Sequence, residues 1–540
     1  MTIPPDVNGP RPHGGRLRPA TLVALASCAW FILTAQPFMT RLGIQTDEAW
    51  FAAPIYLPGS ALYYFRLGTL RAAMMRASYI GTLKTLLWTP IFGLFGPNAW
   101  SVREPSVLLG ALTIWLFFVL MRRIAGERAA AVGSVLLAID TMFLLTTCYD
   151  FGPEVVGHIP LIAALVLLVH FFDNGSEIVL AGASLLVGLA LWDKALALWL
   201  LGAMGVAGLV FYPRQMLKLG GPRRVALALF WIALGALPLV LYNIHSRLGT
   251  LRQNALPDHV AFHVKAWALK SSFDGAILFG FLDAVPENTP VPREPSTAIE
   301  KASAWLADIT DHPRHEWILY ASVMALLLTP LASSGERRII WFCLLTMAIA
   351  WAQMVWTTKS GTSVHHTILM WPLPQAVMGI SFAAASRRLQ SRGIPVLAGL
   401  LIVLTLSCTL VTNNYYAAMA RNGGTPQWST ALAPLADFLK TQRASVIYSM
   451  DWGFTDTIAL LDRGQLPLAL DVPDEQRDIP AMLSRPDALF VAHTPEATFF
   501  PERNATLLAA AARLGYRQEV VKVVWDEYGR QMFVVYRMKH

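Results

Sequence analysis

The sequence predicts a polytopic α-helical membrane protein that ends in a small soluble α/β domain. Hydrophobic residues make up 55% of the 540 residues, charged residues make up 14%, and the mean hydropathy is +0.47. Ordinary soluble domains contain about 25% charged residues, so this composition excludes a soluble protein. Several apolar runs also reach the roughly 20 residues that a helix needs to cross hydrocarbon.

These apolar runs predict eleven membrane-spanning helices. The run from Ile178 to Tyr212 is too long for one span. Its middle contains Trp192-Asp193-Lys194, so we expect two short helices with a turn near Lys194. Nine further spans are expected at about residues 19–40, 104–121, 129–147, 155–172, 224–244, 316–334, 339–357, 366–386 and 394–412.

Lys and Arg residues concentrate in alternate loops, which predicts the orientation because cytoplasmic loops contain the excess of these residues. The short loops at about 148–154 and 358–366 offer only Lys359. We therefore expect a cytoplasmic N-terminus and an extracytoplasmic C-terminus. The same side chains account for most of the net charge of +8, so no nucleic-acid partner is expected. The loops assigned to the cytoplasm contain Arg11, Arg16, Arg18, Arg122, Arg123, Arg128, Arg214, Lys218, Arg223, Arg224, Arg337, Arg338, Arg387, Arg388 and Arg392.

Three parts of the chain are distinguished by composition. Residues 1–18 form a cytoplasmic tail, residues 19–412 a transmembrane domain, and residues 413–540 an extracytoplasmic α/β domain. The transmembrane domain has two long outside segments, at 41–103 and 245–315. Interleaved Tyr, Trp and Arg residues in the first of these favour short amphipathic helices at the membrane interface.

The C-terminal part alternates helical and strand-like patterns. The segments LAPLADFLK, TDTIALLDR and ATLLAAAARLG alternate with ASVIYSM, ALFVAH, QEVVKVVW and QMFVVYR, which suggests strands joined by crossover helices. No GxGxxG or P-loop pattern occurs, which favours a recognition or structural domain over a nucleotide site. The four cysteines lie in or at the ends of spans without CxxC spacing and are interpreted as small apolar fillers: Cys28, Cys148, Cys343 and Cys408.

Carboxylates mark the outer ends of two spans. Asp47 and Glu48 follow the first apolar run, and Asp150 lies in CYDFGPE on the second outside loop, so all three face the same aqueous side. They could converge on one cavity. Each also has a structural interpretation: Asp47 could be a helix N-cap ahead of AWFAAPIY, and Asp150 could be a turn residue before Gly-Pro.

Three cations lie on the same side. Lys84 occurs in YIGTLKTLLW, Arg103 in NAWSVREPS, and Lys194 in GLALWDKALALW. Cations beside apolar helices at headgroup depth suit the phosphate of a lipid. Taken singly, each is more often a side chain that extends its charge to the membrane surface than a phosphate ligand.

The order of these motifs resembles the GT-C membrane glycosyltransferases. An apolar span is followed by Asp47-Glu48, an aromatic-rich loop, G-x-L-K-x-x-L, L-F-G, R-x-P-S and another span. Within that superfamily the chain is similar to glycosyltransferase family 39, the branch of protein O-mannosyltransferases and of aminoarabinose transferases that modify lipid A. The likeness covers residues 19–245, and later only HHTILMWPLP matches. One departure is Lys84-Thr85-Leu86-Leu87, where that branch often has Lys-Pro-Pro-Leu.

The resemblance implies a glycosyltransferase that moves a sugar, with inversion, from a polyprenyl-phosphate donor to an acceptor on the extracytoplasmic face. Asp47 would be the general base, and Glu48 would orient it or contact the donor. Asp150 would contact the acceptor, or bind Mg²⁺ or Mn²⁺ together with Asp47. The donor phosphate would be neutralised by such a metal or by cationic side chains. The residues expected at the donor are Lys84, Arg103 and Lys194 for the phosphate, and His365 and His366 for sugar or phosphate contacts.

The acceptor and two other function classes stay open at this stage. Lipid A, another envelope glycan or lipid, and a protein Ser or Thr are all acceptable acceptors, and the resemblance implies a bacterial inner membrane. One competing class is a transporter or flippase for a lipid-linked substrate, in which Asp47, Asp150 and Lys194 form an ion or substrate path. The other is an envelope-polymer binding protein, in which the outside cations are dispensable.

Overall fold

The computed structural model describes residues 18–68, 70–150, 152, 154–257, 259–276, 278, 282, 293–310, 315–358, 360–469 and 479–540. Some residues used in the sequence predictions lie outside these ranges. They are Arg11, Arg16 and Lys359 of the orientation argument, and Phe151 and Pro153 of the DFGPE motif.

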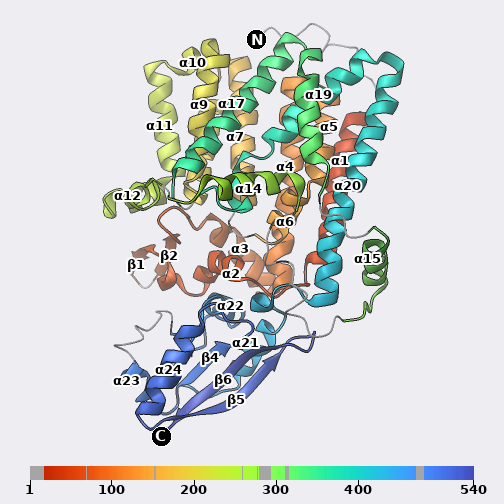
Figure 1. The fold of residues 1–540 in the computed structure, drawn as a ribbon. Coiled ribbons are helices and arrows are strands. Elements are labelled where there is room, and N and C mark those ends of the chain that lie inside the picture. The colour runs from red at the N-terminus through yellow and green to blue at the C-terminus, as the bar shows by residue number, and fades with distance from the viewer. Residues whose placement is uncertain are drawn as a thin grey trace.

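A bundle of helices forms most of the molecule, and a small sheet domain lies at one end of it (Figure 1). Helix α1 begins at the end of the bundle far from the sheet domain, and the C-terminus lies within that domain. The bundle helices are α1 (Pro19–Ala35), α4 (Ala99–Ala125), α5 (Glu127–Ile139), α6 (Thr141–Cys148), α7 (Glu154–Asn174), α8 (Glu177–Asp193), α9 (Ala197–Phe211), α10 (Pro213–Leu219), α11 (Pro222–Gly235), α12 (Leu237–His245), α16 (Ile318–Leu328), α17 (Ser334–Trp356), α18 (Val364–Thr367), α19 (Leu373–Arg388) and α20 (Gly393–Asn422).

Local sequence signals explain where the long helices begin and end. Helix α4 begins after Asn98, whose side chain accepts a hydrogen bond from the Ser101 backbone, and it ends at Gly126 with φ of 85°. Helix α17 begins after Ser333, which forms a reciprocal capping pair with Glu336. Between these signals α17 contains no proline, and α4 continues through Pro105 in its second turn.

Fewer candidate spans than the expected eleven are found in the described part of the chain. Among the described residues, five helices are long and apolar enough to cross a membrane, or up to nine if each bent helix pair counts as one span. The two remaining expected spans correspond to α8, with 17 residues, and α16, with 11 residues. Both are shorter than the roughly 20 residues that cross hydrocarbon. The break near Lys194 is confirmed, because α8 ends at Asp193 and α9 begins at Ala197.

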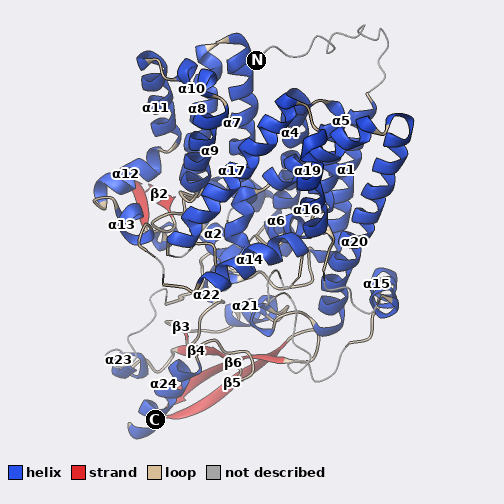
Figure 2. Cartoon of the chain, turned by 45° about the horizontal axis from the view of Figure 1, so that its top comes forward, coloured by secondary structure: helices blue, strands red, loops and turns tan. Residues whose placement is uncertain are grey.

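The first outside segment contains a β-hairpin in addition to short helices (Figure 2). This hairpin was not expected from the interleaved aromatic and basic residues, which fit either structure. Its strands β1 (Tyr63–Leu67) and β2 (Leu70–Met75) pair antiparallel. Helices of the outside segments are α2 (Thr46–Ala52), α3 (Leu83–Phe95), α13 (Gly249–Asn254), α14 (Phe262–Asp274) and α15 (Ala298–Ile309), and short 3-10 helices occur at Gln36–Phe38, Ala53–Ile55, Pro58–Ser60, Thr329–Leu331, Ile368–Met370, Gln390–Arg392 and Pro426–Trp428.

The C-terminal part forms a four-stranded sheet in the order β3-β4-β6-β5. Strands β3 and β4 are parallel, and the other neighbours are antiparallel. Side chains of β4 alternate between two apolar clusters, one with Leu489 and Val491, the other with Phe490 and Ala492. Helices therefore cover both faces. The elements are α21 (Leu432–Lys440), β3 (Ile447–Ser449), α22 (Thr455–Leu461), α23 (Ile479–Leu483), β4 (Leu489–His493), α24 (Pro501–Arg513), β5 (Arg517–Trp525) and β6 (Gln531–Lys539).

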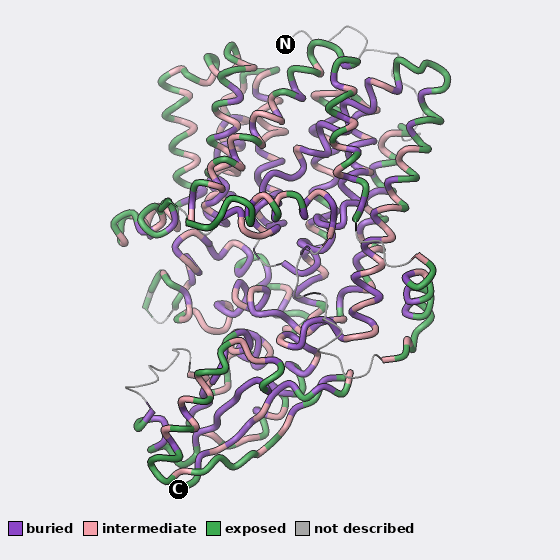
Figure 3. Tube along the Cα trace, in the orientation of Figure 1, coloured by how far each residue is buried: buried purple, intermediate pink, exposed green. Residues whose placement is uncertain are grey.

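Buried residues concentrate in the middle of the bundle, and exposed residues lie along its outer helices (Figure 3). On α11 the exposed side chains include Leu229 and Phe230, as expected of a surface that faces lipid. The inner side of α11 touches α8 at two glycines. A Cβ on Gly188 would collide with the Ile232 carbonyl, and a Cβ on Gly235 would collide with the Leu185 carbonyl. The two backbones are thus in direct contact.

Candidate active site

Helix α2 presents the two adjacent carboxylates of the first outside segment. Its N-cap is Gln45, whose side chain accepts a hydrogen bond from the Asp47 backbone at 2.6 Å. Glu48 completes this cap by accepting from the Gln45 backbone at 3.0 Å. The interpretation of Asp47 as the N-cap is therefore wrong, and its half-buried carboxylate is not used to begin the helix.

Glu48 and Arg103 form a completely buried bidentate ion pair. The Arg103 Nε and Nη2 atoms each lie 2.8 Å from a Glu48 oxygen. The remaining guanidinium hydrogens bond the carbonyls of Met39, Leu42 and Gly43 at 2.8 to 2.9 Å. All five donors of Arg103 are thus occupied within the protein. The pair anchors α2 to α4, and this placement does not bring Arg103 to a phosphate.

Lys84 and Asp150 form a second buried ion pair. Lys84 Nζ lies 2.6 Å from Asp150 Oδ2, and each side chain is 2% exposed. The other oxygen, Asp150 Oδ1, accepts from the Glu154 backbone at 3.2 Å. Burial raises the pKa of Asp150, and the Lys84 ammonium opposes that rise. Lys84 is therefore buried and does not extend its charge to the membrane surface.

Lys194 pairs with Glu154, a residue that the sequence reasoning did not select. Lys194 Nζ donates to Glu154 Oε1 and, at 3.3 Å, to the His365 carbonyl. Burial lowers the pKa of Lys194, but Glu154, together with Tyr79 and Asp193, raises it, and the net shift is upward. Glu154 is the last residue of the same DFGPE motif that contains Asp150, and that motif could have identified it.

Backbone bonding brings the two lysines together. The Gly81 backbone donates to the Asp193 carbonyl at 3.0 Å, and Ala195 donates to the Tyr79 carbonyl at 2.8 Å. This close approach requires glycine, because a Cβ on Gly81 would collide with the Trp192 carbonyl. The segment before α3 therefore lies directly against the turn that contains Lys194.

Asp47 and Asp193 are the carboxylates of this region that lack a cation partner. Among the described residues, Asp47 forms no ion pair, and burial raises its pKa to about 7. Lys194 lowers that pKa and Asp456 raises it further. The Asp193 side chain is 1% exposed, and both of its oxygens lack hydrogen-bond partners among the described residues. Asp193 is a second residue that the sequence reasoning missed.

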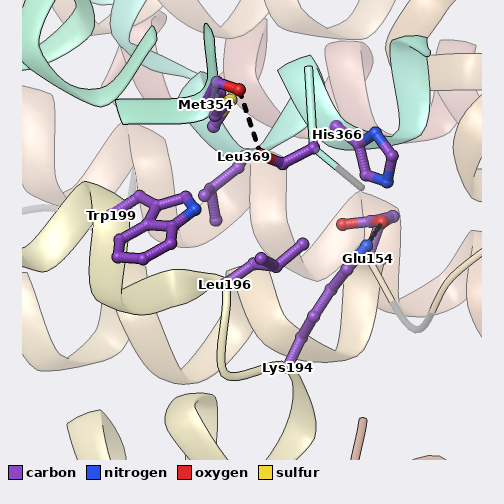
Figure 4. A pocket seen from close by; sticks show the side chains of 8 residues that line it. Glu154, Lys194, Leu196, Trp199, Met354, His366 and Leu369 are labelled. Atoms are coloured by element: carbon purple, nitrogen blue, oxygen red, sulfur yellow. Dashed lines mark hydrogen bonds and ion pairs between the residues drawn. The ribbon is translucent and has the colours of Figure 1, made fainter. Parts of the chain in front are cut away.

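A small cavity of about 10 Å³ lies beside Lys194 (Figure 4). Its polar end contains Glu154, Lys194 and His366, and Ser360 also lines it. The His366 ring lies 4.2 Å from that of His365, and its Nδ1 atom has no hydrogen-bond partner in the described part of the chain. The opposite wall is apolar and consists of Leu196, Trp199, Met354 and Leu369.

The expected metal ligands do not form a divalent-cation site as they are placed. Asp150 has one oxygen on the Lys84 ammonium and the other on a backbone amide, whereas Mg²⁺ and Mn²⁺ require free oxygen ligands in near-octahedral geometry. Within the described ranges, no group of three or more His, Cys, Asp or Glu side chains could hold a metal ion.

Comparison with known proteins gives a family for the central part of the chain. Residues 85–242 match the family described as dolichyl-phosphate-mannose-protein mannosyltransferase. These residues include Asp150, Glu154 and Lys194. No curated protein matches the chain.

Three solved structures share the fold. ArnT from Cupriavidus metallidurans, bound to undecaprenyl phosphate, aligns with a TM-score of 0.56 and 14% identity over 95% of this chain and 97% of that chain. The arabinofuranosyltransferase AftD from Mycobacteria aligns with a TM-score of 0.51 and 15% identity over 97% of this chain and 42% of that chain. The Archaeoglobus fulgidus oligosaccharyltransferase with a tethered acceptor peptide aligns with a TM-score of 0.50 and 9% identity over 96% of this chain and 74% of that chain.

The resemblance inferred from the sequence motifs is therefore confirmed by the family match and the shared fold. The chain is a multi-pass membrane protein that shares the GT-C fold with ArnT, and its residues 85–242 match the family described as dolichyl-phosphate-mannose-protein mannosyltransferase.

Proposed function

We propose that this protein is a glycosyltransferase that takes a sugar from a polyprenyl-phosphate donor and transfers it to a hydroxyl or amine on the extracytoplasmic face. The observation that carries the proposal is the cavity beside Lys194, whose charged end adjoins an apolar wall. A polyprenyl phosphate likewise consists of a charged group, the phosphate, followed by an apolar part, the isoprenoid chain. The shared fold with ArnT, which was solved with undecaprenyl phosphate, supports this choice of donor.

Lys84 and Lys194 stabilise the leaving group. The donor is a phosphodiester, and the polyprenyl phosphate that leaves it gains a second negative charge. The two ammonium groups therefore bind the leaving group more strongly than the donor, which lowers the barrier to transfer. Both lysines are buried, so water screens these interactions little.

Donor binding requires that the two lysines exchange partners. In the structure they are paired with Asp150 and Glu154, and the cavity of about 10 Å³ holds no more than one water molecule. A phosphate must therefore displace one or both carboxylates from the ammonium groups. Asp150, once released from Lys84, becomes available to an acceptor, which is the role expected for it.

Asp47 acts as the general base. The acceptor oxygen or nitrogen forms a bond to the anomeric carbon, the bond from that carbon to the phosphate oxygen breaks, and its electron pair stays on the phosphate. The acceptor proton moves to the Asp47 carboxylate. Attack from the face opposite the phosphate inverts the anomeric configuration. A pKa of about 7 suits this role, because a base is most effective when its pKa is near the working pH.

Glu48 and Arg103 position the base rather than contact the donor. Their bidentate pair fixes the first turn of α2, in which Asp47 precedes Glu48. His366 is a candidate contact for the sugar or phosphate, because its unpartnered Nδ1 atom lies at the polar end of the cavity. His365 contributes its backbone carbonyl to Lys194.

The proposed location is a bacterial inner membrane with the site on the outer side. The outside segment 41–103 and the sheet domain lie at the same end of the bundle, away from the start of α1 (Figure 1). Lipid A, another envelope glycan or lipid, and a protein Ser or Thr are proposed acceptor classes. The transfer assay must therefore include all of them.

Release of undecaprenyl phosphate tests the proposal. Detergent-purified protein is incubated with undecaprenyl phosphate linked to mannose, aminoarabinose or arabinofuranose, each with lipid A, an envelope lipid extract or a Ser/Thr peptide. Acceptor-dependent release of undecaprenyl phosphate is the expected result. Movement of the intact lipid-linked sugar across a vesicle bilayer, without release, would instead support a transporter.

A matched lysine provides the control. Lys194→Ala should weaken release of undecaprenyl phosphate, because it removes a buried charge from the polar end of the cavity. Lys270→Ala removes a lysine that also pairs with a carboxylate, Asp274, but on α14 and with its own side chain 56% exposed. Equal losses in the two variants would contradict the assignment of Lys194.

A further inference from the structure

The sheet domain contacts the helix that contains the general base. Helix α22 of this domain packs against α2, and Thr457 Oγ1 donates to the Ile44 carbonyl at 3.1 Å, just before α2 begins. Figure 1 shows α22 at the edge of the sheet domain that faces the bundle. The active-site region therefore has a boundary formed by the C-terminal part of the chain.

One arginine connects the two parts. Arg76, at the end of the hairpin, donates from Nε to the Trp50 carbonyl at 2.8 Å and from Nη1 to the Ser60 carbonyl. Its Nη2 atom lies 2.8 Å from Asp456 Oδ1 on α22. The guanidinium also lies over the Trp50 ring, 4.7 Å from its centroid. Arg76 thus bonds α2, the segment after it and the sheet domain at once.

These bonds restrain the same helix that Arg103 restrains. Trp50 lies three residues after Asp47, so the two share one side of α2. Glu48 is held from α4 by Arg103, and the carbonyl of Trp50 is held by Arg76, whose own position depends on Asp456. Helix α2 has only seven residues and little stability of its own. Its orientation therefore depends on these two attachments.

The Arg76–Asp456 pair is better suited to positioning than to stabilising the fold. Burial lowers the pKa of Arg76 and raises that of Asp456, in each case against the effect of the partner. The attraction between the two charges thus does not fully offset their removal from water. Buried pairs of this kind contribute little net stability.

We propose that Asp456 is a positioning residue for sugar transfer: by orienting Arg76 it holds α2 so that Asp47 meets the acceptor, and the sheet domain thereby completes the active site. The inference rests on the proposed role of Asp47. It assigns the C-terminal domain a part in the reaction in addition to any part in recognition.

Asp456→Asn is the first test, because asparagine keeps an oxygen for Arg76 but removes the charge. With the undecaprenyl-phosphate sugar that the wild-type protein uses fastest, kcat should fall about 10- to 100-fold, the scale expected for a small misplacement of a reacting group. KM for the donor should stay near the wild-type value, and the melting temperature should fall by less than in Glu48→Gln, because the Asp456 side chain is 28% exposed whereas that of Glu48 is fully buried. A loss of activity that matches a loss of folded protein would overturn the proposal.

A second ion pair between the sheet domain and the outside segments provides the control. Glu527 lies 3.7 Å from Arg293, away from α2. Glu527→Gln should leave kcat unchanged, so an equal fall in kcat in that variant would contradict a specific role for Asp456.

A double-mutant cycle tests whether Asp456 acts through Arg76. Arg76→Lys keeps a charge but loses the guanidinium fork, and its effect on kcat should not add to that of Asp456→Asn. Independent, additive effects would overturn the proposed connection. Asp47→Asn is measured in parallel. If Asp47→Asn retains full activity, the proposed function itself fails. If Asp47→Asn loses activity strongly while Asp456→Asn keeps a wild-type kcat, only the positioning role is rejected.

Discussion

The Lys84 ammonium lies 2.6 Å from the Asp150 carboxylate inside the protein, where each side chain is 2% exposed. Neither charge is hydrated, so the stability of each ionised group inside the protein depends on its contact with the other. Removal of one partner from such a pair costs about 3 to 5 kcal/mol, because the remaining charge stays buried without compensation. The same contact that is proposed to yield to a donor phosphate is therefore also needed for the stability of the empty protein.

Lys84→Ala should lower both the melting temperature and donor turnover. The double variant Lys84→Ala, Asp150→Asn should recover much of the melting temperature, because it no longer buries an unpaired charge, but it should not recover turnover. Thermal unfolding and undecaprenyl phosphate release, measured on the same preparations, separate the two effects. A double variant no more stable than Lys84→Ala would argue against a mutual dependence of the charges.

Asp47→Asn and Glu48→Gln should affect different properties. Asp47→Asn removes the base, so transfer should fall about 10²- to 10⁴-fold, while the cap by Gln45 is kept. Glu48→Gln leaves the buried Arg103 without its anionic partner, so the melting temperature should fall. Sugar transfer and thermal unfolding of both variants are the measurements. A near-wild-type rate in Asp47→Asn would remove the catalytic assignment.

The pH dependence of transfer should follow Asp47. Burial raises its pKa from 3.8 to about 7, with a further rise from Asp456 and an opposing effect of Lys194. Because the base must be ionised, kcat/KM should increase with pH and level off above about pH 7. The experiment is a pH profile of transfer with the donor at low concentration. A profile without an inflection near neutrality would contradict this assignment.

The same carboxyl should affect stability with the opposite sign. Between pH 3.8 and about 7 the folded protein holds the Asp47 proton that the unfolded chain has lost, so this group's contribution to stability falls as pH rises through that window. Asp47→Asn should therefore melt at a higher temperature relative to wild type at pH 8 than at pH 4. A difference in melting temperature that does not vary with pH would contradict the raised pKa.

Reporter fusions should locate the two ends of the bundle. Fusions after Arg128 or Arg338 should read cytoplasmic, and a fusion after His540 should read external, because Lys and Arg accumulate in the loops that remain inside. An internal signal from the His540 fusion would mean that the number of membrane-spanning helices is even rather than odd.

Much of the fold could be predicted because it depends on local patterns. The interruption at Asp193 and Lys194 ended one helix and preceded another as expected. The short apolar run ALFVAH indicated a strand, and the side chains from Leu489 to Ala492 point alternately to the two faces of the sheet. Hydropathy does not report where a helix such as α16 ends, so the apolar run at 316–334 did not reveal that this helix has only 11 residues.

The arrangement of the site depends on contacts between distant segments, which composition does not encode. Lys84 and Arg103 gave the same signal in the sequence, a cation beside an apolar run. In the structure the donors of Arg103 are taken up by Glu48 and nearby carbonyls, whereas Lys84 reaches Asp150. Nothing near Asp456 in the sequence relates it to α2. Only the packing of α22 against that helix reveals the connection.

Because α8 and α11 touch through Gly188 and Gly235, the thickness of the bilayer should affect the rate of transfer. Since the two backbones touch, no side chain at the crossing can absorb a displacement of α11. Lateral pressure on the lipid-facing side of α11 should therefore be transmitted to the end of α8, where Lys194 follows. We expect turnover in proteoliposomes to change with acyl-chain length, as membrane thickness tilts α11, and Gly235→Ala to alter that dependence by separating the two helices.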